Sequence, residues 1–407
     1  MKSMARWKAA SFAGLVAAAG IHAGAAWAQS GYKIGISGAA TGPASPSYLP
    51  HIEGLRIYLS QLNDKGGVNG HKIDFIILDD KAAPSEAANN AKRLMDDEQV
   101  LAVALMSLSS TYAPMFQAAA RTKTPLLLLG QAVCPANAST PQMNPYVFCG
   151  GSTSDPNTAG YWQVPLVKAL ADKNKDKLKL ALVAMDIPIS RQGIDNMEKL
   201  AGEMKIEVVD KQSVPPAAAD VSGAAARIIA NNANYVTSWA PVTTAVQMLG
   251  ALRRQGWNGW FIHNHSAEAE DTLRQLKDPK LVMSPEYAFS VDKLPVFSEI
   301  EAAAKKYGVN LPVDTLTLGW ASGMMLEAAL KQCGMPCSRE KLLAVLNTAN
   351  VETAGIYPDA VKWTKEDHTR PASFTAYAWD PKSSSVRRIT EWSKVKAGDL
   401  ATVKVID

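Results

Sequence analysis

The sequence lacks the motifs that mark several common classes of enzyme. It contains no G-x-S-x-G nucleophile motif, no G-x-x-x-x-G-K-[ST] phosphate loop and no H-E-x-x-H zinc motif. His263-Asn264-His265 with Glu268 could place two imidazoles on one side of a strand, but nothing else in the sequence supports a metal. We therefore predict no catalytic residue, no metal and no cofactor. An exported hydrolase or metalloenzyme is kept as the rival interpretation.

The excess of positive over negative charge is also small. The formal net charge is +4 over 407 residues, and loss of three basic residues in the N-terminal leader described below would leave +1. So small a charge gives no support to binding of nucleic acid or of an anionic membrane. With 47% hydrophobic and 20% charged residues, the composition is that of globular domains, and the length suffices for two or three.

The apolar stretch at residues 11–26 is too short to anchor the chain in a membrane. It falls below the ~20 residues that a spanning helix needs, and His22 interrupts it. A charged start precedes it, made of Lys2, Arg6 and Lys8, and Ala26-Trp27-Ala28 forms an A-x-A cleavage site. We predict that residues 1–28 are a cleaved signal peptide and that the mature protein is soluble in the periplasm.

Cysteine is rare, with four residues in the chain. None lies near the predicted cleavage site, so a lipid anchor is not expected. An even number in an oxidising compartment suits disulfides, and of the three possible pairings sequence proximity favours Cys134–Cys149 and Cys333–Cys337. Closing a loop near 15 residues is worth roughly 3 kcal/mol. A metal site is a poor alternative because neither pair has C-x-x-C spacing.

The stretch from 33 to 80 predicts a β–α–β unit. An apolar strand at 34–36 enters a loop of small and turn residues at 38–50. The helix that follows has one apolar face, made of Ile52, Leu55, Leu59 and Leu62. Gly66-Gly67 ends the helix, and a second strand at 73–78 ends in Asp79-Asp80.

The rest of the chain continues to alternate strands and helices. Such alternation predicts parallel, doubly wound sheets. Further strands are expected at 100–106, 125–129, 178–185, 206–210, 235–239 and 260–263, with a terminal pair at 374–379 and 386–391.

The opening unit resembles that of the branched-chain-amino-acid-type periplasmic binding proteins, the substrate-binding subunits of ABC importers. The matching residues, in order, are Ile34-Gly35, Thr41-Gly42-Pro43, Gly54, Asn63, Lys65-Gly66-Gly67-Val68-Asn69-Gly70 and Asp79-Asp80. The resemblance continues more faintly to about Trp379. It implies the type I periplasmic binding protein fold, an α/β fold of two lobes joined by hinge strands with a ligand cleft between them.

We place the lobes accordingly. Lobe 1 is expected to span 29–151 and 286–366, and lobe 2 to span 152–285 and 367–407. The resemblance implies a small-molecule ligand and a membrane permease as partners, and we expect a monomer that does not bind nucleic acid. A ligand sensor that docks on a receptor is a further alternative.

In open parallel sheets, ligands bind beyond the carboxyl ends of the strands. The resemblance places the family's aromatic contact at Tyr48, its serine pair at Ser109 and Ser110, and its backbone-and-hydroxyl loop near Gln131 and Ala132. The free N–H groups at the start of a helix would hold a carboxylate there.

The other lobe is expected to contribute Ser190, Arg191, Trp239 and His265. Here the sequence departs from the amino-acid-binding pattern, because His265 aligns with the ammonium-binding glutamate and Pro241 with the second tyrosine. Trp239 could stack on a planar ligand and Arg191 could pair with an anion. We predict a carboxylate-bearing ligand, an aromatic acid rather than leucine or isoleucine, with an amide or amino acid as the alternative.

Overall fold

The computed structural model describes residues 31–135, 144–152, 160–215, 220–264, 269–396 and 398–406. The chain divides into two units, Met1–Ser30 and Gly31–Asp407, and only the second unit is described below. The predicted signal peptide at 1–28 therefore lies outside the described residues.

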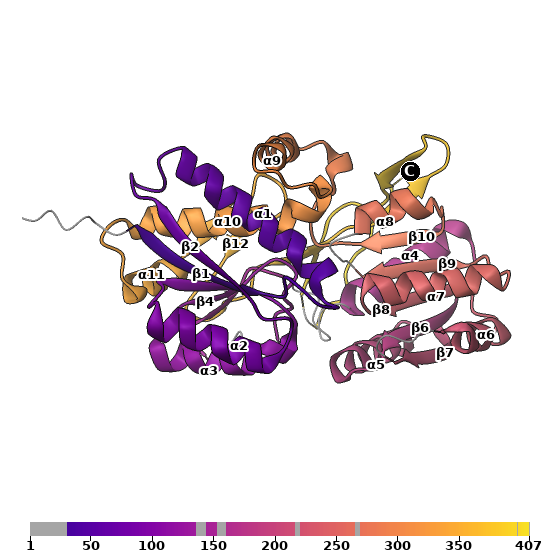
Figure 1. Cartoon of the computed structure of the whole chain (residues 1–407). Coiled ribbons are helices and arrows are strands. Elements are labelled where there is room, and N and C mark those ends of the chain that lie inside the picture. The colour runs from indigo at the N-terminus through magenta and orange to yellow at the C-terminus, as the bar shows by residue number, and fades with distance from the viewer. Residues whose placement is uncertain are drawn as a thin grey trace, which may run out of the picture. The chain divides into compact units, whose positions relative to one another are not determined.

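The first sheet has five parallel strands in the order β2-β1-β3-β4-β5 (Figure 1). Its strands are β1 (Tyr32–Gly38), β2 (Ile73–Asp79), β3 (Ala102–Met106), β4 (Leu126–Leu128) and β5 (Val147–Cys149). Successive side chains of a strand point to opposite faces, so β3 sends Ala104 and Met106 to one core and Val103 and Leu105 to another. Both faces of the sheet are thus buried.

Helices from both ends of the chain cover this sheet. In Figure 1, α1 and α10 lie on one face and α2 and α3 on the other. The elements are α1 (Ser45–Asp64), α2 (Pro84–Ala91), the π-helix η1 (Lys92–Asp97), the 3₁₀ turn η2 (Ser109–Thr111), α3 (Tyr112–Thr122), α9 (Pro295–Lys306), α10 (Val313–Cys333) and α11 (Arg339–Leu346). Helices α1 and α10 pack closely at Gly54 and Gly319. A Cβ at Gly319 would lie 2.0 Å from the carbonyl oxygen of His51.

The second sheet has seven strands in the order β15-β14-β10-β9-β8-β6-β7. They are β6 (Lys179–Met185), β7 (Glu207–Val214), β8 (Tyr235–Trp239), β9 (Trp260–Asn264), β10 (Leu281–Ser284), β14 (Tyr377–Asp380) and β15 (Ser385–Arg388). Strands β6 to β10 are parallel, and β14 and β15 join the edge antiparallel. This edge is the predicted terminal strand pair.

Five helices cover the two faces of this sheet. Residues of α4 and α5 share one core with Leu180 and Leu182 of β6, while residues of α6, α7 and α8 share another with Ala181 and Val183. The helices are α4 (Gly160–Asn174), α5 (Pro188–Glu203), α6 (Ser222–Ala230), α7 (Val242–Arg254) and α8 (Ala269–Leu276). The prediction of two doubly wound α/β sheets is confirmed.

The chain passes between the two sheets three times, after β5, after β10 and before β14. Short elements accompany these connections, namely η3 (Ser290–Asp292), β11 (Asn350–Val351), β12 (Val361–Lys362), β13 (Ala372–Phe374) and β16 (Ser393–Val395). Residues 368–370 run beside β5, since Cys149 N donates to His368 O at 2.8 Å and Arg370 N donates to Cys149 O at 3.2 Å.

Both predicted disulfides are present. Cys134–Cys149 joins the loop after β4 to the end of β5, and Cys333–Cys337 closes the end of α10, each with 5.6 Å between the two Cα atoms. That distance is in the usual range for a disulfide.

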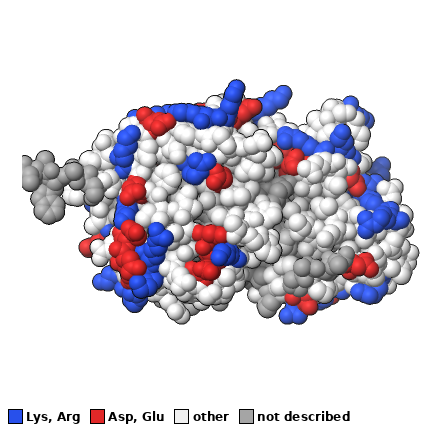
Figure 2. Space-filling view, in the orientation of Figure 1, with Lys and Arg blue, Asp and Glu red and all other residues white. Residues whose placement is uncertain are grey.

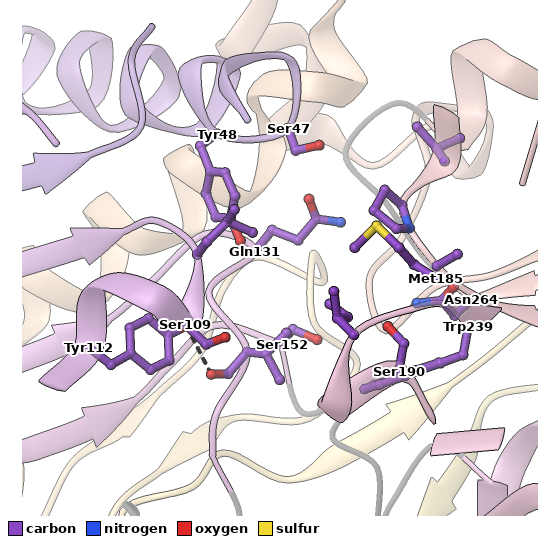
Figure 3. Close-up of a pocket in the computed structure, with 16 residues that line it drawn as sticks. Ser47, Tyr48, Ser109, Tyr112, Gln131, Ser152, Met185, Ser190, Trp239 and Asn264 are labelled. Atoms are coloured by element: carbon purple, nitrogen blue, oxygen red, sulfur yellow. Dashed lines mark hydrogen bonds between the residues drawn. The ribbon is translucent and has the colours of Figure 1, made fainter. Parts of the chain in front are cut away.

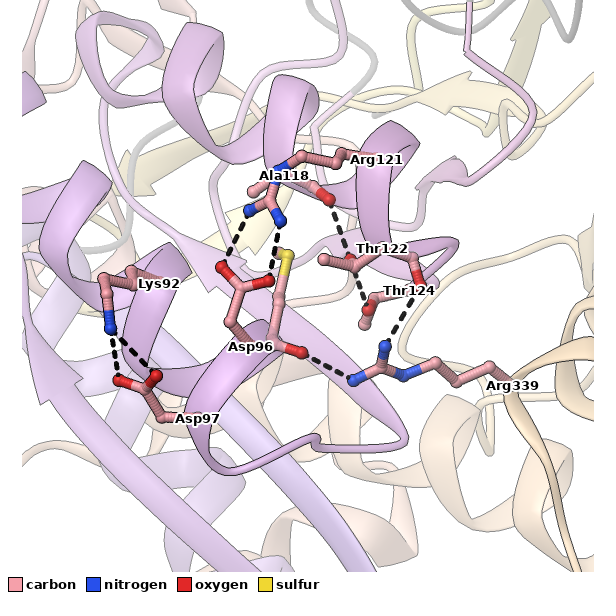
Figure 4. Close-up of polar contacts among 9 residues, drawn as sticks. Lys92, Asp96, Asp97, Ala118, Arg121, Thr122, Thr124 and Arg339 are labelled. Atoms are coloured by element: carbon pink, nitrogen blue, oxygen red, sulfur yellow. Dashed lines mark hydrogen bonds and ion pairs between the residues drawn. The ribbon is translucent and has the colours of Figure 1, made fainter.

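Around the first sheet many charged side chains at the surface are paired with the opposite sign. In the half of the face of Figure 2 that carries α1, α2 and α3, basic and acidic groups are interspersed. Figure 4 shows Arg121 bound to both carboxylate oxygens of Asp96, each at 2.7 Å. Nearby, Arg339 ties the start of α11 to η1, to the loop before β3 and to the end of α3, because its guanidinium donates to the carbonyls of Met95, Val100 and Thr122. Among the described helices, none is long and apolar enough to cross a membrane.

Candidate ligand-binding site

A pocket of about 170 Å³ lies where the carboxyl ends of strands from both sheets meet. Met185, Trp239 and Asn264 are the last residues of β6, β8 and β9. From the first sheet and its helices the lining is Ser47, Tyr48, Leu108, Ser109, Tyr112, Gln131, Val133 and Ser152. From the second it is Met185, Ile187, Ser190, Trp239, Ala240, Pro241, Val242 and Asn264. Figure 3 shows the two groups facing each other across the space.

A buried carboxyl group, Asp80, holds the first wall together. It follows β2 directly and accepts hydrogen bonds from Ser37 Oγ at 3.2 Å, Ser107 Oγ at 2.7 Å and Ala82 N at 2.9 Å. These donors come from the end of β1, the end of β3 and the loop after β2. Burial raises the pKa of Asp80, against the opposing effect of the hydrogen bonds from Ser107 and Ala82. The carboxyl thus fixes three loops beneath the pocket.

Tyr48 of α1 and Tyr112 of α3 supply the aromatic part of this wall. Burial, with the nearby Asp80 charge adding to it, raises the pKa of Tyr48 above its ordinary value, so its phenol stays protonated and can donate. The Tyr112 hydroxyl donates to Val133 O at 3.0 Å, which ties the start of α3 to the loop after β4.

The two serines after β3 have different surroundings. They lie in the one-turn helix η2, which precedes α3, and neither element has a side-chain cap. Ser109 lines the pocket, whereas Ser110 does not and its hydroxyl donates to Ala82 O at 3.0 Å. The first N–H groups of a helix have no intrahelical acceptor, and here those groups belong to the turn that begins at Ser109.

The second wall is largely apolar and is centred on Trp239. Its side chain is 5% exposed and its indole packs on Gly193 of α5, where a Cβ would lie 2.5 Å from Trp239 Cε3. Only glycine at 193 leaves room for this indole position. The side-chain amide of Asn264 fits its surroundings when its nitrogen donates to Ser238 O and Ala240 O, both at 3.2 Å. In this orientation the amide nitrogen and oxygen exchange the places drawn in Figure 3. The amide oxygen is then the acceptor on the pocket side.

Of the nine ligand contacts predicted from the sequence, five line the pocket: Tyr48, Ser109, Gln131, Ser190 and Trp239. Ala132 is fully buried and, like Ser110, is not in the lining. Arg191 lies outside the lining, on α5, with its guanidinium bonded to Asp186 Oδ1 at 2.9 Å. His265 lies outside the described residues.

Sequence reasoning missed several lining residues. Tyr112 belongs to a helix, and Ser152 stands in a loop without a pattern. Asn264 was named only within a histidine-rich stretch. A signal existed for it, because it ends a strand at the edge where ligands bind in parallel sheets.

The described lining carries no formal charge. It contains hydroxyls, amides, aromatic rings and aliphatic groups, but no Asp, Glu, Lys, Arg or His. Among the described residues there is also no cluster of three or more His, Cys, Asp or Glu suited to a metal ion. The described lining can therefore enclose a small ligand and orient it by neutral hydrogen bonds.

Comparison with known proteins identifies the family. A family model described as periplasmic binding protein matches residues 31–384. The chain belongs to this family. A relative from Pseudomonas aeruginosa described as an amino acid binding protein is 22% identical over 358 residues, covering 86% of this chain and 90% of that one.

Solved structures share the fold of this periplasmic binding protein at low identity. The LivJ substrate-binding protein of Streptococcus pneumoniae, in complex with isoleucine, has a TM-score of 0.72 at 14% identity, covering 92% of this chain and 99% of that one. A solute-binding protein of an ABC transporter from Rhodopseudomonas palustris BisB5, in complex with 3,4-dihydroxy benzoic acid, has a TM-score of 0.71 at 17% identity, covering 92% and 98%.

The family fixes the broad class of this protein. It is a periplasmic binding protein, and members of this family are not enzymes. The rival interpretation as a hydrolase or metalloenzyme is therefore set aside.

Proposed function

We propose that this protein captures a small aromatic carboxylate in the periplasm and delivers it to the permease of a branched-chain-amino-acid-type ABC importer. The observation that carries the proposal is the described lining, which has three aromatic side chains and no formal charge. Each end of the ligand can be argued from it in turn.

The ring end follows from size and from the aromatic residues. An apolar cavity of about 150 Å³ holds a benzene molecule, and this pocket measures about 170 Å³. Tyr48 and Tyr112 stand on one wall and Trp239 on the other. A planar ligand between such side chains gains area burial and favourable ring contacts.

The carboxylate end follows from the donors at Ser109. The turn that begins there leads into α3, its first N–H groups have no intrahelical acceptor, and the hydroxyls of Ser109 and Tyr48 add further donors. The same features disfavour an ammonium group, which would lose its hydration and find no anionic partner in the described lining. This asymmetry favours an acid without an α-ammonium over an amino acid.

Two of the solved relatives hold ligands of the two classes under comparison. One holds 3,4-dihydroxy benzoic acid and another holds isoleucine, so an aromatic acid and an amino acid are both compatible with the fold. The proposal includes the division into lobes at 29–151 with 286–366 and 152–285 with 367–407, and closure of those lobes around the ligand.

A thermal-shift screen tests the ligand class. A ligand that binds only the native state increases the free energy of unfolding by mass action, by about 2.7 kcal/mol at 100 times its Kd, and therefore raises the melting temperature. Benzoate and phenylacetate should raise the melting temperature, and leucine and isoleucine should not. A response to leucine with none to the aromatic acids would overturn the assignment.

The proposed location has its own test. Intact-mass measurement of protein from the periplasmic fraction should show a chain beginning at Gln29, after the Ala26-Trp27-Ala28 site. A membrane-embedded product that retains Met1 would contradict export as a soluble protein.

A further inference from the structure

The three connections between the sheets meet at one buried ion pair. Arg370 lies on the connection before β14 and Glu286 on the one after β10, and Arg370 Nη2 pairs with Glu286 Oε2. Their side chains are 3% and 1% exposed. Away from water such a pair is weakly screened, and removal of one member leaves an uncompensated buried charge.

The same guanidinium reaches the remaining connection. Arg370 Nε donates to Gly151 O at 2.7 Å, directly after β5, and Nη1 donates to Pro371 O at 3.0 Å. Its central carbon also stands 4.0 Å from the centre of the Tyr357 ring. The planar, many-donor geometry of arginine is what allows one side chain to bind a carboxylate and two backbone carbonyls together. A lysine could not make all these bonds.

The network also includes a residue of the pocket. Ser152 lines the pocket, and its side chain is visible there in Figure 3. Its hydroxyl donates to Glu286 Oε1 at 3.0 Å. A hydroxyl has one donor hydrogen and two acceptor lone pairs, so a ligand that contacts this oxygen changes the bonding available to Glu286.

We infer that Ser152, Glu286 and Arg370 form a hinge clamp, a set of positioning residues that fixes the angle between the lobes. A ligand in the pocket changes this angle through its contact with Ser152. The inference rests on the proposed function, because it concerns closure around a ligand. It assigns to these three residues the control of lobe closure, a role distinct from direct recognition of the ligand.

Distance measurement between spin labels tests the clamp without any ligand. Cysteines introduced as Asn89→Cys on α2 and Lys199→Cys on α5 place labels at exposed sites on helices of the two sheets, and the native cysteines are all in disulfides. In the ligand-free protein, Glu286→Gln should broaden the distance distribution and shift its maximum. Ser152→Ala should change it in the same way but less.

A matched control removes an ion pair away from the connections. Asp186→Asn breaks the exposed Arg191–Asp186 pair and should leave the distribution as in the wild type. If Glu286→Gln gives the wild-type distribution, the clamp is wrong. If only Ser152→Ala does, the pocket residue is not part of it. Should Glu286→Gln fail to fold, Ser152→Ala decides alone: broadening supports the clamp, and a wild-type distribution contradicts it.

Addition of benzoate separates this inference from the proposed function. In the wild type benzoate should shift the distribution toward shorter distances. Absence of that shift, together with broadening in ligand-free Glu286→Gln, contradicts benzoate as a ligand but supports the clamp. A benzoate-induced shift with no effect of either substitution supports the proposed function and contradicts the clamp.

Discussion

The two walls of the pocket are built on different principles. The first wall consists of loop and helix-start residues fastened from below by Asp80, which accepts bonds from Ser37, Ser107 and Ala82. The second consists mainly of apolar side chains around Trp239, which rests on Gly193. The first wall offers donors for a carboxylate, and the second offers a surface for the rest of the ligand. On this account Trp239 of the second wall makes the main contact with the ring, and the lack of an anionic group in the described lining disfavours an amino acid.

The largest effect is expected at the centre of the second wall. Trp239→Ala should weaken benzoate binding by about 2 kcal/mol, roughly thirtyfold in Kd, because truncation of a buried aromatic contact removes most of one binding face. Titration calorimetry measures it. Trp239→Phe keeps a ring and should retain most of the affinity, and equal losses in both variants would contradict a stacking role.

A smaller effect is expected beneath Trp239. Gly193→Ala should displace the indole and weaken benzoate binding by about 1.5 kcal/mol, since overpacking of a tight site costs energy of this order. Gly202 lies on the same helix and a Cβ there meets nothing within 4 Å, so Gly202→Ala is the matched control. It should leave the affinity unchanged and raise the melting temperature slightly. If Gly193→Ala binds benzoate normally, the position of the indole does not matter.

The first wall is expected to respond less. Ser109→Ala should cost about 1 kcal/mol, roughly fivefold in Kd, as the loss of one hydrogen bond to the ligand. The neighbouring Ser110→Ala should leave Kd unchanged, because that side chain points to Ala82 O and not into the pocket. Calorimetry on the two variants sharpens the assignment, and a larger loss for Ser110→Ala would reverse it.

The smallest effect is expected at Arg191. The sequence suggested it as an anion contact, but its guanidinium pairs with Asp186 outside the pocket. Arg191→Ala should therefore leave the Kd for benzoate within error of the wild type. A tenfold loss would show that the arginine leaves Asp186 to meet the ligand.

The same contrast between walls separates what sequence could predict from what it could not. Strands and helices followed from apolar periodicity, and Tyr48, Ser109 and Gln131 followed from a resemblance that is strongest in the opening unit. On the second wall the same reasoning chose Arg191 over Asn264. The direction of a side chain at the start of α5 depends on the neighbouring Asp186, and no periodicity encodes that pairing.

The hinge clamp lay beyond sequence reasoning altogether. Ser152, Glu286 and Arg370 are separated by 134 and 84 positions along the chain. None belongs to a motif, and they meet because they lie on the three connections between the two sheets.

Calorimetric titration with phenylacetate and phenylglycine tests the central claim most directly, because the two acids differ only by the α-ammonium group of the second. If the pocket has donors for a carboxylate and no partner for an ammonium, phenylacetate should bind at least tenfold more tightly, since an uncompensated buried charge costs more than the roughly 1.4 kcal/mol that this ratio represents. Tighter binding of phenylglycine would contradict the account and assign the pocket to amino acids.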